Sequence, residues 1–327
     1  MKKLLAPVAT VLLCLSAAGT ALAAFSDVPQ THKNYVAVTY LNQEGIVNGY
    51  EDGTFKPEQG VNRAEALKII LEGNKSEIPA SITEVSFSDI TVSDWFSPYI
   101  MTAKNMGIVS GNPDGTFAPA REVARAEFLK MLLNTNGFKP EKWVGVQIFP
   151  DVPVGTWFEA YMNYAGQAGL ITKDELGNVR PGEPLVRGEV AEIMYLMTVI
   201  LNGSNTQFLI TQAELQMAQI DIYVGNNDPL AAKRASELAV DMTQQAYKNM
   251  PEDTIVLGAA KLARAYDFLV NSYISGIEQN YDEARDWANQ AIAKATEAWE
   301  VNNAIQPIAK HIKDRANEII DQLPAAV

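Results

Sequence analysis

Cysteine and histidine are nearly absent from this sequence. Among 327 residues there is one cysteine, Cys14, and the two histidines, His32 and His311, lie far apart with no second ligand one helical turn away. A disulfide needs two cysteines, and zinc sites are built mainly from cysteine and histidine. The composition therefore predicts no disulfide, no thiolate chemistry and no metal site. Stability must come from the burial of apolar side chains.

Long apolar runs are also scarce. The main one, residues 4–15, is shorter than the ~20 residues that a membrane-spanning helix needs. Because it follows Lys2-Lys3 and precedes the small residues Ala21-Leu22-Ala23, it predicts a secretory signal peptide over residues 1–24. No comparable run follows. We expect a protein exported to the cell surface or envelope, with no transmembrane segment in the mature chain.

Basic residues are the minority charge. The chain has 26 lysines and arginines against 39 aspartates and glutamates, a formal net charge of −13. Nucleic-acid binding needs clustered basic residues, so nucleic acid is not an expected partner. No phosphate-binding loop, dinucleotide fingerprint or GxSxG motif is present, and we expect neither a cofactor nor an enzyme. An acidic chain can still bind an anionic polymer where a few arginines converge.

The sequence is rich in internal repetition. Residues recur at a strict interval of 62 over three copies between Phe25 and Ile200, and no gap is needed. A constant interval across repeats and linkers predicts three copies of one supersecondary unit in equivalent poses. The function is therefore expected to lie in a repeated binding surface. The matching positions are Phe25, Phe87 and Phe149; Asp27, Asp89 and Asp151; Gly45, Gly107 and Gly169; Gly53, Gly115 and Gly177; Pro57, Pro119 and Pro181; Arg63, Arg125 and Arg187; and Glu65, Glu127 and Glu189.

Each copy is predicted to form a helix, a tight loop and a second helix. In the second copy, apolar residues recur at helical spacing over residues 97–106, and Gly107 ends the helix. Asp114-Gly115 is typical of a turn. A second helix is expected from Arg125 to Asn136-Gly137, with its apolar residues on one face.

The start of the second helix differs between the copies. Asn62 and Glu65 are predicted to form a capping box in the first copy. Ala124 and Val186 occupy the equivalent position in the other copies and cannot cap. Each loss should cost about 1 kcal/mol of helix-start stability unless another side chain substitutes.

The first copy carries the motif that suggests a family. From Phe25 to Leu71 the sequence reads FSDV…GIVNGYEDGTFKPEQGVNRAEALKIIL, which resembles the S-layer homology domain. The predicted order is the signal peptide and then three such domains, over residues 25–75, 87–137 and 149–200. The resemblance implies a pseudo-threefold arrangement of the copies. It also implies non-covalent attachment to an anionic cell-wall polysaccharide, such as a pyruvylated polymer, in grooves between adjacent domains.

The copies depart from the family pattern at several positions. The family's threonine before Arg-Ala-Glu is replaced in all three copies, and the aromatic residue at the first helix is Lys33 in the first copy. In the third copy the loop over residues 173–179 keeps only Gly177 of the family's turn. A complete set of ligand contacts would therefore have to combine residues from different copies, and at least one groove could be purely structural.

The three periodic arginines have two competing interpretations. A guanidinium can grip a ligand carboxylate with two parallel hydrogen bonds. Alternatively, each arginine forms an internal ion pair with a periodic aspartate and staples one copy to the next. We expect Arg63 and Arg125, which follow intact loops, to contact the ligand, and Arg187, which follows the degenerate loop, to act as the staple.

Aromatic residues and glycines complete the candidate set. Trp95 and Trp157 could stack on sugar rings, although tryptophan at a repeat junction more often packs in the core, which we favour here. Gly53 and Gly115 are expected to serve turn geometry, and their N–H groups could also donate to ligand oxygens. The candidate glycan-binding residues are Arg63, Arg125, Arg187, Asp27, Asp89, Asp151, Gly53, Gly115, Trp95 and Trp157.

The second half of the chain has a different pattern. Residues 205–327 contain few glycines and several long helical periods, so the chain as a whole is predicted to be mainly α. A four- or five-helix bundle is the simplest expectation. Two stretches, residues 223–239 and 266–291, weakly resemble degenerate tetratricopeptide hairpins. The expected helices cover residues 207–224, 228–248, 253–276, 281–299 and 304–322.

Three functions fit this organisation. The leading hypothesis is a surface anchor whose repeats bind cell-wall or envelope polysaccharide and present a helical domain that binds another protein. The first alternative is a structural protein that assembles laterally into a surface layer. The second alternative is an enzyme that acts on wall glycan.

Overall fold

The computed structural model describes residues 25–138, 140 and 147–324. The predicted signal peptide lies outside these residues. Over the described residues the chain forms helices and no sheet, with only isolated β-bridges between loops. It divides into two units. Ala24–Val28 and Ala37–Met197 form the first, called the repeat unit, and Pro29–Val36 and Thr198–Val327 form the second, called the helical unit.

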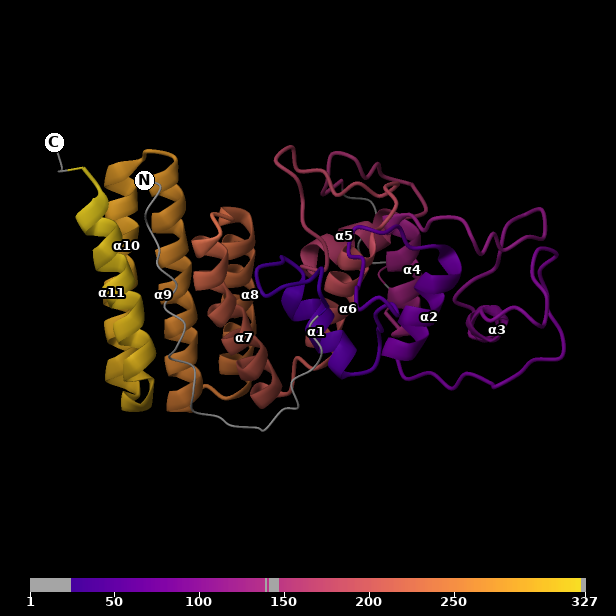
Figure 1. Cartoon of the computed structure of the whole chain (residues 1–327), viewed down its shortest axis with the longest axis horizontal. Helices are drawn as coiled ribbons and strands as arrows, with labels where there is room; N and C mark the ends of the chain where they lie inside the picture. Colours follow the sequence, from indigo (N-terminus) through magenta and orange to yellow (C-terminus); the bar gives the residue numbers. More distant parts are fainter. Residues whose placement is uncertain (1–24, 139, 141–146, 325–327) are drawn as a thin grey trace. The chain divides into compact units, whose positions relative to one another are not determined.

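The three copies of the repeat each contribute two helices, as predicted (Figure 1). The second helix of one copy packs against the first helix of the next, as α2 does on α3 and α4 does on α5. The division between the two units falls within α1 and within α6. The six helices are α1 (Tyr35–Gln43), α2 (Arg63–Gly73), α3 (Ser97–Asn105), α4 (Arg125–Thr135), α5 (Glu159–Gln167) and α6 (Arg187–Leu201).

A closed ring of backbone hydrogen bonds joins the three copies. Val61 N donates to Leu185 O at 3.0 Å, Leu185 N to Val123 O at 3.1 Å, and Val123 N to Val61 O at 2.9 Å. Their side chains are completely buried. Because each copy donates once and accepts once, the copies are related by the predicted pseudo-threefold arrangement.

Neighbouring copies also cap the helices. The predicted capping box of Asn62 and Glu65 is present at the start of α2. Ala124 provides no side-chain cap for α4, but the first two N–H groups of that helix donate to Glu183 O and Pro181 O of the third copy. The first two N–H groups of α2 make the equivalent contacts, with Arg121 O and Pro119 O, so these carbonyl groups satisfy the helix starts in both copies but do not replace the side-chain acceptor that Ala124 lacks.

The helical unit consists of five long helices that agree with the predicted ranges to within about two residues. α7 pairs with α8 and α9 pairs with α10, while α9 also packs against α7, α8 and α11. They lie side by side in Figure 1. The helices are α7 (Thr206–Gly225), α8 (Pro229–Asn249), α9 (Thr254–Ile277), α10 (Tyr281–Val301) and α11 (Gln306–Gln322), and a short 3₁₀ helix (Asn303–Ile305) precedes α11.

Helix starts and small residues explain this packing. Asp228 and Asp253 cap α8 and α9 through their carboxylates. The face of α10 that meets its neighbours is built from fully buried alanines, among them Ala284 and Ala291, which let helices approach closely. The hairpin order resembles a tetratricopeptide array. However, α7 and α8 have 20 and 21 residues, so this pair alone is longer than a ~34-residue tetratricopeptide repeat.

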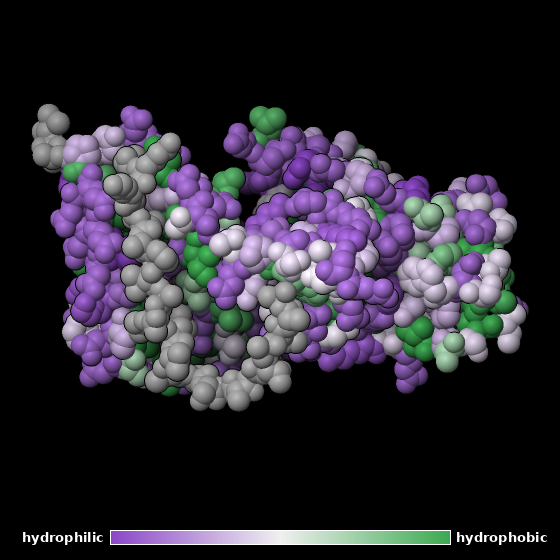
Figure 2. Space-filling view, viewed as in Figure 1, coloured by the Kyte–Doolittle hydropathy of each residue, from purple (hydrophilic) through white to green (hydrophobic). Residues whose placement is uncertain are grey.

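Hydrophilic residues predominate on the face of the chain seen in Figure 2, and hydrophobic residues form small separate patches. Among the described residues, no helix combines the length and the apolar character required to cross a membrane.

Candidate functional site

The periodic aspartates hold the loops of their own copies. Both carboxylate oxygens of Asp27 accept backbone N–H groups, from Phe55 at 2.8 Å and from Lys56 at 2.7 Å. Asp89 and Asp151 make the same pair of contacts in their copies. In the first copy this fixes a loop in which Lys56 has a φ of 58°. The degenerate third loop keeps the same contacts, so its shape survives the loss of its sequence motif.

Arg63 and Arg125 are buried staples between copies. They are 7% and 4% exposed, and each reaches into the following copy. Arg63 pairs with Glu127 at 3.1 Å and donates to Phe117 O at 3.1 Å. Arg125 pairs with Glu189 at 2.8 Å. The stapling interpretation thus holds for these two residues, but the partner is a glutamate of the next copy rather than the predicted aspartate.

Burial affects the electrostatics of the first staple. It lowers the pKa of Arg63, an effect that the nearby carboxylate of Glu127 opposes. Burial would raise the pKa of Glu127, but hydrogen bonds from Arg121 and Ala124 N, together with the charges of Arg63 and Arg121, lower it overall. The guanidinium and the carboxylate therefore both remain charged at neutral pH.

Arg187 differs from the other two arginines. Its Nε donates to Phe55 O at 2.9 Å and its Nη2 to Asn48 O at 3.1 Å, both in the first copy. Over the described part of the chain it has no carboxylate partner within salt-bridge distance, and it is only partly buried. Its guanidinium and the Lys56 ammonium lie 5.1 and 4.0 Å from the centroid of the Tyr50 ring. Arg187 therefore joins two copies, as predicted for it, but through backbone carbonyl groups and not through an ion pair. Whether any of the three arginines contacts a ligand stays a prediction.

The two tryptophans lie on the surface, and the expectation that they are buried was wrong. Trp95 and Trp157 are each 54% exposed. The phenylalanine that follows each of them, Phe96 or Phe158, is more buried and contacts the indole with its ring edge. The indole is therefore left on the outside of the copy.

A lysine from the preceding copy lies close to each indole. Lys68 Nζ is 5.8 Å from the Trp95 ring centroid, and Lys130 Nζ is 5.3 Å from that of Trp157. These lysines are 62 residues apart, like the tryptophans, so the repeat interval was a signal that could have identified them. In the third copy Glu192 stands at the lysine position.

A tyrosine one helical turn after each tryptophan was also missed. Tyr99 Oη donates to Glu72 Oε1 at 2.9 Å, and Tyr161 Oη donates to Asn134 Oδ1 at 3.3 Å. Burial, followed by the contact with Glu72, raises the pKa of Tyr99 to about 12. The Tyr99 hydroxyl therefore stays protonated and fixes α3, which begins two residues after Trp95.

Gly53 and Gly115 have the predicted role in turn geometry. Their φ angles are 78° and 83°, in the left-handed region that glycine tolerates. Gly53 N donates to Tyr50 O at 3.0 Å and Gly115 N to Asn112 O at 3.1 Å. These N–H groups are used within their own turns, which leaves them unsuited to the second role considered for them.

Each of the three copies matches the model of one known domain family. Three segments, residues 24–67, 86–129 and 148–191, match the S-layer homology domain. The chain contains three S-layer homology domains. The matched segments overlap the three domains predicted from the sequence, and the buried arginines lie near the end of the first two segments.

The chain spans less than a third of the length of each curated relative named here. The chain is 31% identical to cell surface glycoprotein 1 of Acetivibrio thermocellus over 46% of this chain and 7% of that protein. It is 31% identical to an S-layer protein of Bacillus licheniformis over 58% and 21%. It is 30% identical to a cellulosome-anchoring protein of A. thermocellus over 43% and 31%. The S-layer homology domains and these relatives indicate an exported protein with an anchoring or surface-layer role at the cell surface.

Proposed function

We propose that the chain anchors itself to the cell surface by binding an anionic wall polysaccharide through its S-layer homology domains. The observation that carries this proposal is the pair of exposed tryptophans, Trp95 and Trp157, at equivalent positions of two copies. An exposed indole offers a flat apolar face to a sugar ring, with a polar edge toward water. The neighbouring Lys68 and Lys130 add positive charge beside each indole.

In this proposal the guanidinium of Arg187 binds a carboxylate of the ligand. Its planar guanidinium can form two parallel hydrogen bonds to a carboxylate such as a pyruvate ketal. Lys56 and Tyr50 provide a second cation and an aromatic face beside it. Local positive charge of this kind is needed because the chain as a whole has a net charge of −13.

The remaining predicted site residues act indirectly. Arg63 and Arg125 hold adjacent copies together, while the periodic aspartates and the turn glycines fix the loops around the surface. We assign glycan contacts to all three places where copies meet. Trp95 lies between the first and second copies, Trp157 between the second and third, and Arg187 between the third and first. In this proposal the helical unit is the part presented to a protein partner, and the chain has no catalytic role.

Co-sedimentation with purified cell-wall polysaccharide tests the proposal. The double variant Trp95→Ala/Trp157→Ala should lose most binding, because stacking contributes at two sites. Trp299→Ala, which removes a tryptophan of α10, is the matched control and should bind like the unchanged protein. If the double variant pellets with the polymer as well as the control does, the tryptophans are not the binding surface.

A surface-layer role is the second candidate, favoured by the S-layer protein among the relatives. It predicts assembly of the purified chain into large particles without any wall polymer. Sedimentation of the protein alone distinguishes it from the anchor.

A further inference from the structure

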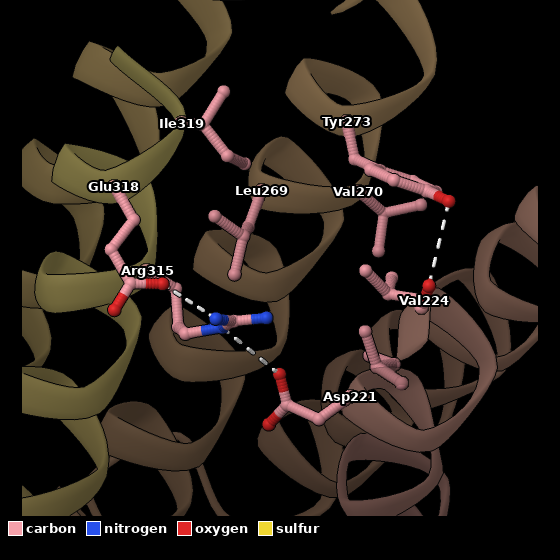
Figure 3. A pocket seen from close by; sticks show the side chains of 9 residues that line it. Asp221, Val224, Leu269, Val270, Tyr273, Arg315, Glu318 and Ile319 are labelled. Atoms are coloured by element: carbon pink, nitrogen blue, oxygen red, sulfur yellow. Dashed lines mark hydrogen bonds and ion pairs between the residues drawn. The ribbon is translucent and has the colours of Figure 1, made fainter. Parts of the chain in front are cut away.

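One end of the helical unit contains a small apolar pocket. The pocket lies where the last turns of α7, α9 and α11 meet (Figure 3). Its volume is about 30 Å³ and its exposed lining is almost entirely apolar, from Ile220, Val224, Leu269, Val270 and Ile319. Pockets for cofactors and other drug-sized ligands have volumes of ~300 Å³ or more. This pocket fits only the tip of an aliphatic side chain.

The charged groups at the rim are paired with one another. Arg315 Nη1 pairs with Glu318 at 2.6 Å and its Nε lies 3.7 Å from Asp221 (Figure 3). Asp221 also contacts His311 Nε2 at 2.7 Å. With these partners in place, the rim does not require a charged ligand, and an apolar occupant fits best.

A protruding leucine lies at the same end of the helical unit. Leu230, the second residue of α8, is 82% exposed. Asp228 caps this helix start by accepting from Ala231 N at 3.0 Å, so the position of Leu230 is fixed. The preceding turn is tied to the pocket, because Tyr273, which lines the pocket, donates to Asn227 Oδ1 at 3.0 Å.

We propose that this end of the helical unit binds a second copy of the chain, with Leu230 of each copy in the pocket of the other. A two-fold axis pairs the same patch on both copies, so a patch that carries both a protrusion and a pocket is self-complementary. Ile277, at the end of α9, is 40% exposed at the same end and extends the apolar contact. The proposal goes beyond glycan binding and does not depend on it.

The chain offers a matched control at the opposite end of the helical unit. Ile255 is also the second residue of its helix, α9, follows an aspartate cap at Asp253, and is 58% exposed. α8 and α9 pack as consecutive antiparallel helices, so their first turns lie at opposite ends of the unit. A substitution at Ile255 therefore makes the same chemical change at the same position within a helix as one at Leu230, but at the end of the unit away from the pocket.

Light scattering on the mature protein over a wide concentration range tests the proposal. We expect the unchanged protein and Ile255→Asp to dimerise with rising concentration, and Leu230→Asp to weaken dimerisation at least about tenfold. Circular dichroism checks that both variants fold. A monomer at every concentration, or equal dimerisation of the two variants, would overturn the proposal. Unchanged wall binding by Leu230→Asp keeps this outcome separate from the fate of the proposed anchoring function.

Cysteine cross-linking provides a second readout that does not rely on lost stability. Cys14, the chain's only cysteine, lies in the predicted signal peptide, so a mature protein from which that peptide has been removed carries only introduced thiols. A mixture of Leu230→Cys and Ile319→Cys chains should form a disulfide-linked heterodimer on mild oxidation. A mixture of Ile255→Cys and Ile319→Cys chains should not. Equal yields from the two mixtures would contradict the proposed contact.

Discussion

The three arginines that begin the second helices share a sequence position but not an environment. Arg63 and Arg125 each have a glutamate partner in the next copy, whereas Arg187 has backbone carbonyls and an aromatic ring. A buried pair that loses one partner leaves an uncompensated charge, which is far more costly than the loss of an exposed contact. The same substitution should therefore have different consequences at different copies.

Arg125→Lys should lower the thermal midpoint more than Arg187→Lys does. Lysine keeps the charge but cannot reproduce the forked contacts of Arg125 with Val179 O and Glu189, and the cost should approach the ~3 kcal/mol of a broken buried pair. Arg187→Lys should instead weaken wall binding with little change in melting. Melting curves and binding isotherms of the two variants check this, and an equal effect on both properties at both positions would contradict it.

Acid should weaken the repeat unit through Glu127. Its folded-state pKa lies below the ordinary value of 4.5, so the unfolded state binds a proton more readily. The resulting stabilisation is complete above about pH 4.5 and is lost as the pH falls through the lower, folded-state pKa. Glu127→Gln should therefore flatten the dependence of the midpoint on pH below 4.5. Glu58→Gln, which changes an exposed glutamate with no ion pair among the described residues, is the matched control.

At the scale of helices, the sequence period was sufficient to predict the architecture. Apolar spacing predicted all five helices of the helical unit and both helices of the second copy, supported by starts such as Asp228-Pro229 and by the stops at Gly107 and Gly137. The partners of the arginines could not be predicted, because the choice between the aspartate and the glutamate depends on how one copy is posed against the next. The exposure of Trp95 could not be read from its residue type either, since Phe96 directly after it is the more buried of the two rings.

A buried ionic cluster should determine the stability of the α8–α9 hairpin. Asp267, only 6% exposed, accepts from Lys233 Nζ at 2.8 Å and Ser236 Oγ at 2.9 Å. Asp267→Ala removes the charged acceptor of the Lys233 and Ser236 hydrogen bonds and should cost about 1.5 to 3 kcal/mol of the free energy of unfolding, because the ammonium left behind is partly exposed and keeps Asn271 as a partner. Asp314→Ala, which breaks the exposed Lys310 pair within α11, should cost at most about 1 kcal/mol. Urea unfolding of both variants compares them, and similar costs would refute a special role for Asp267.

At the scale of the whole chain, one short segment of the first repeat belongs to the helical unit. Pro29–Val36 belongs to the helical unit although it lies within the first repeat of the sequence. Tyr223 of α7 places its hydroxyl 3.4 Å from His32 O and from Lys33 O. The sequence predicted a single boundary near Gly203. It could not predict that residues 29–36 belong to the helical unit, because that depends on a tertiary contact between segments far apart in the chain.

A fragment of residues 25–200 should retain wall binding but melt at a lower temperature than the same unit in the full chain. It keeps the ring of repeats but removes the Tyr223 donor to residues 29–36. Calorimetry and co-sedimentation of the fragment check both properties. Binding that follows residues 204–327 instead would show that the anchor lies in the helical unit.

The ring of hydrogen bonds that joins the copies also determines when the first copy can finish folding during export. The first helical N–H groups of the third copy, from Arg187 and Gly188, donate to Gln59 O and Pro57 O of the first copy. A chain that leaves the cell from its N-terminus therefore exposes an incomplete first copy until Gly188 has passed outside. The first two copies cannot complete this three-membered ring by themselves, so in a chain exported from its N-terminus the ring closes only after more than half of the chain has left the cell.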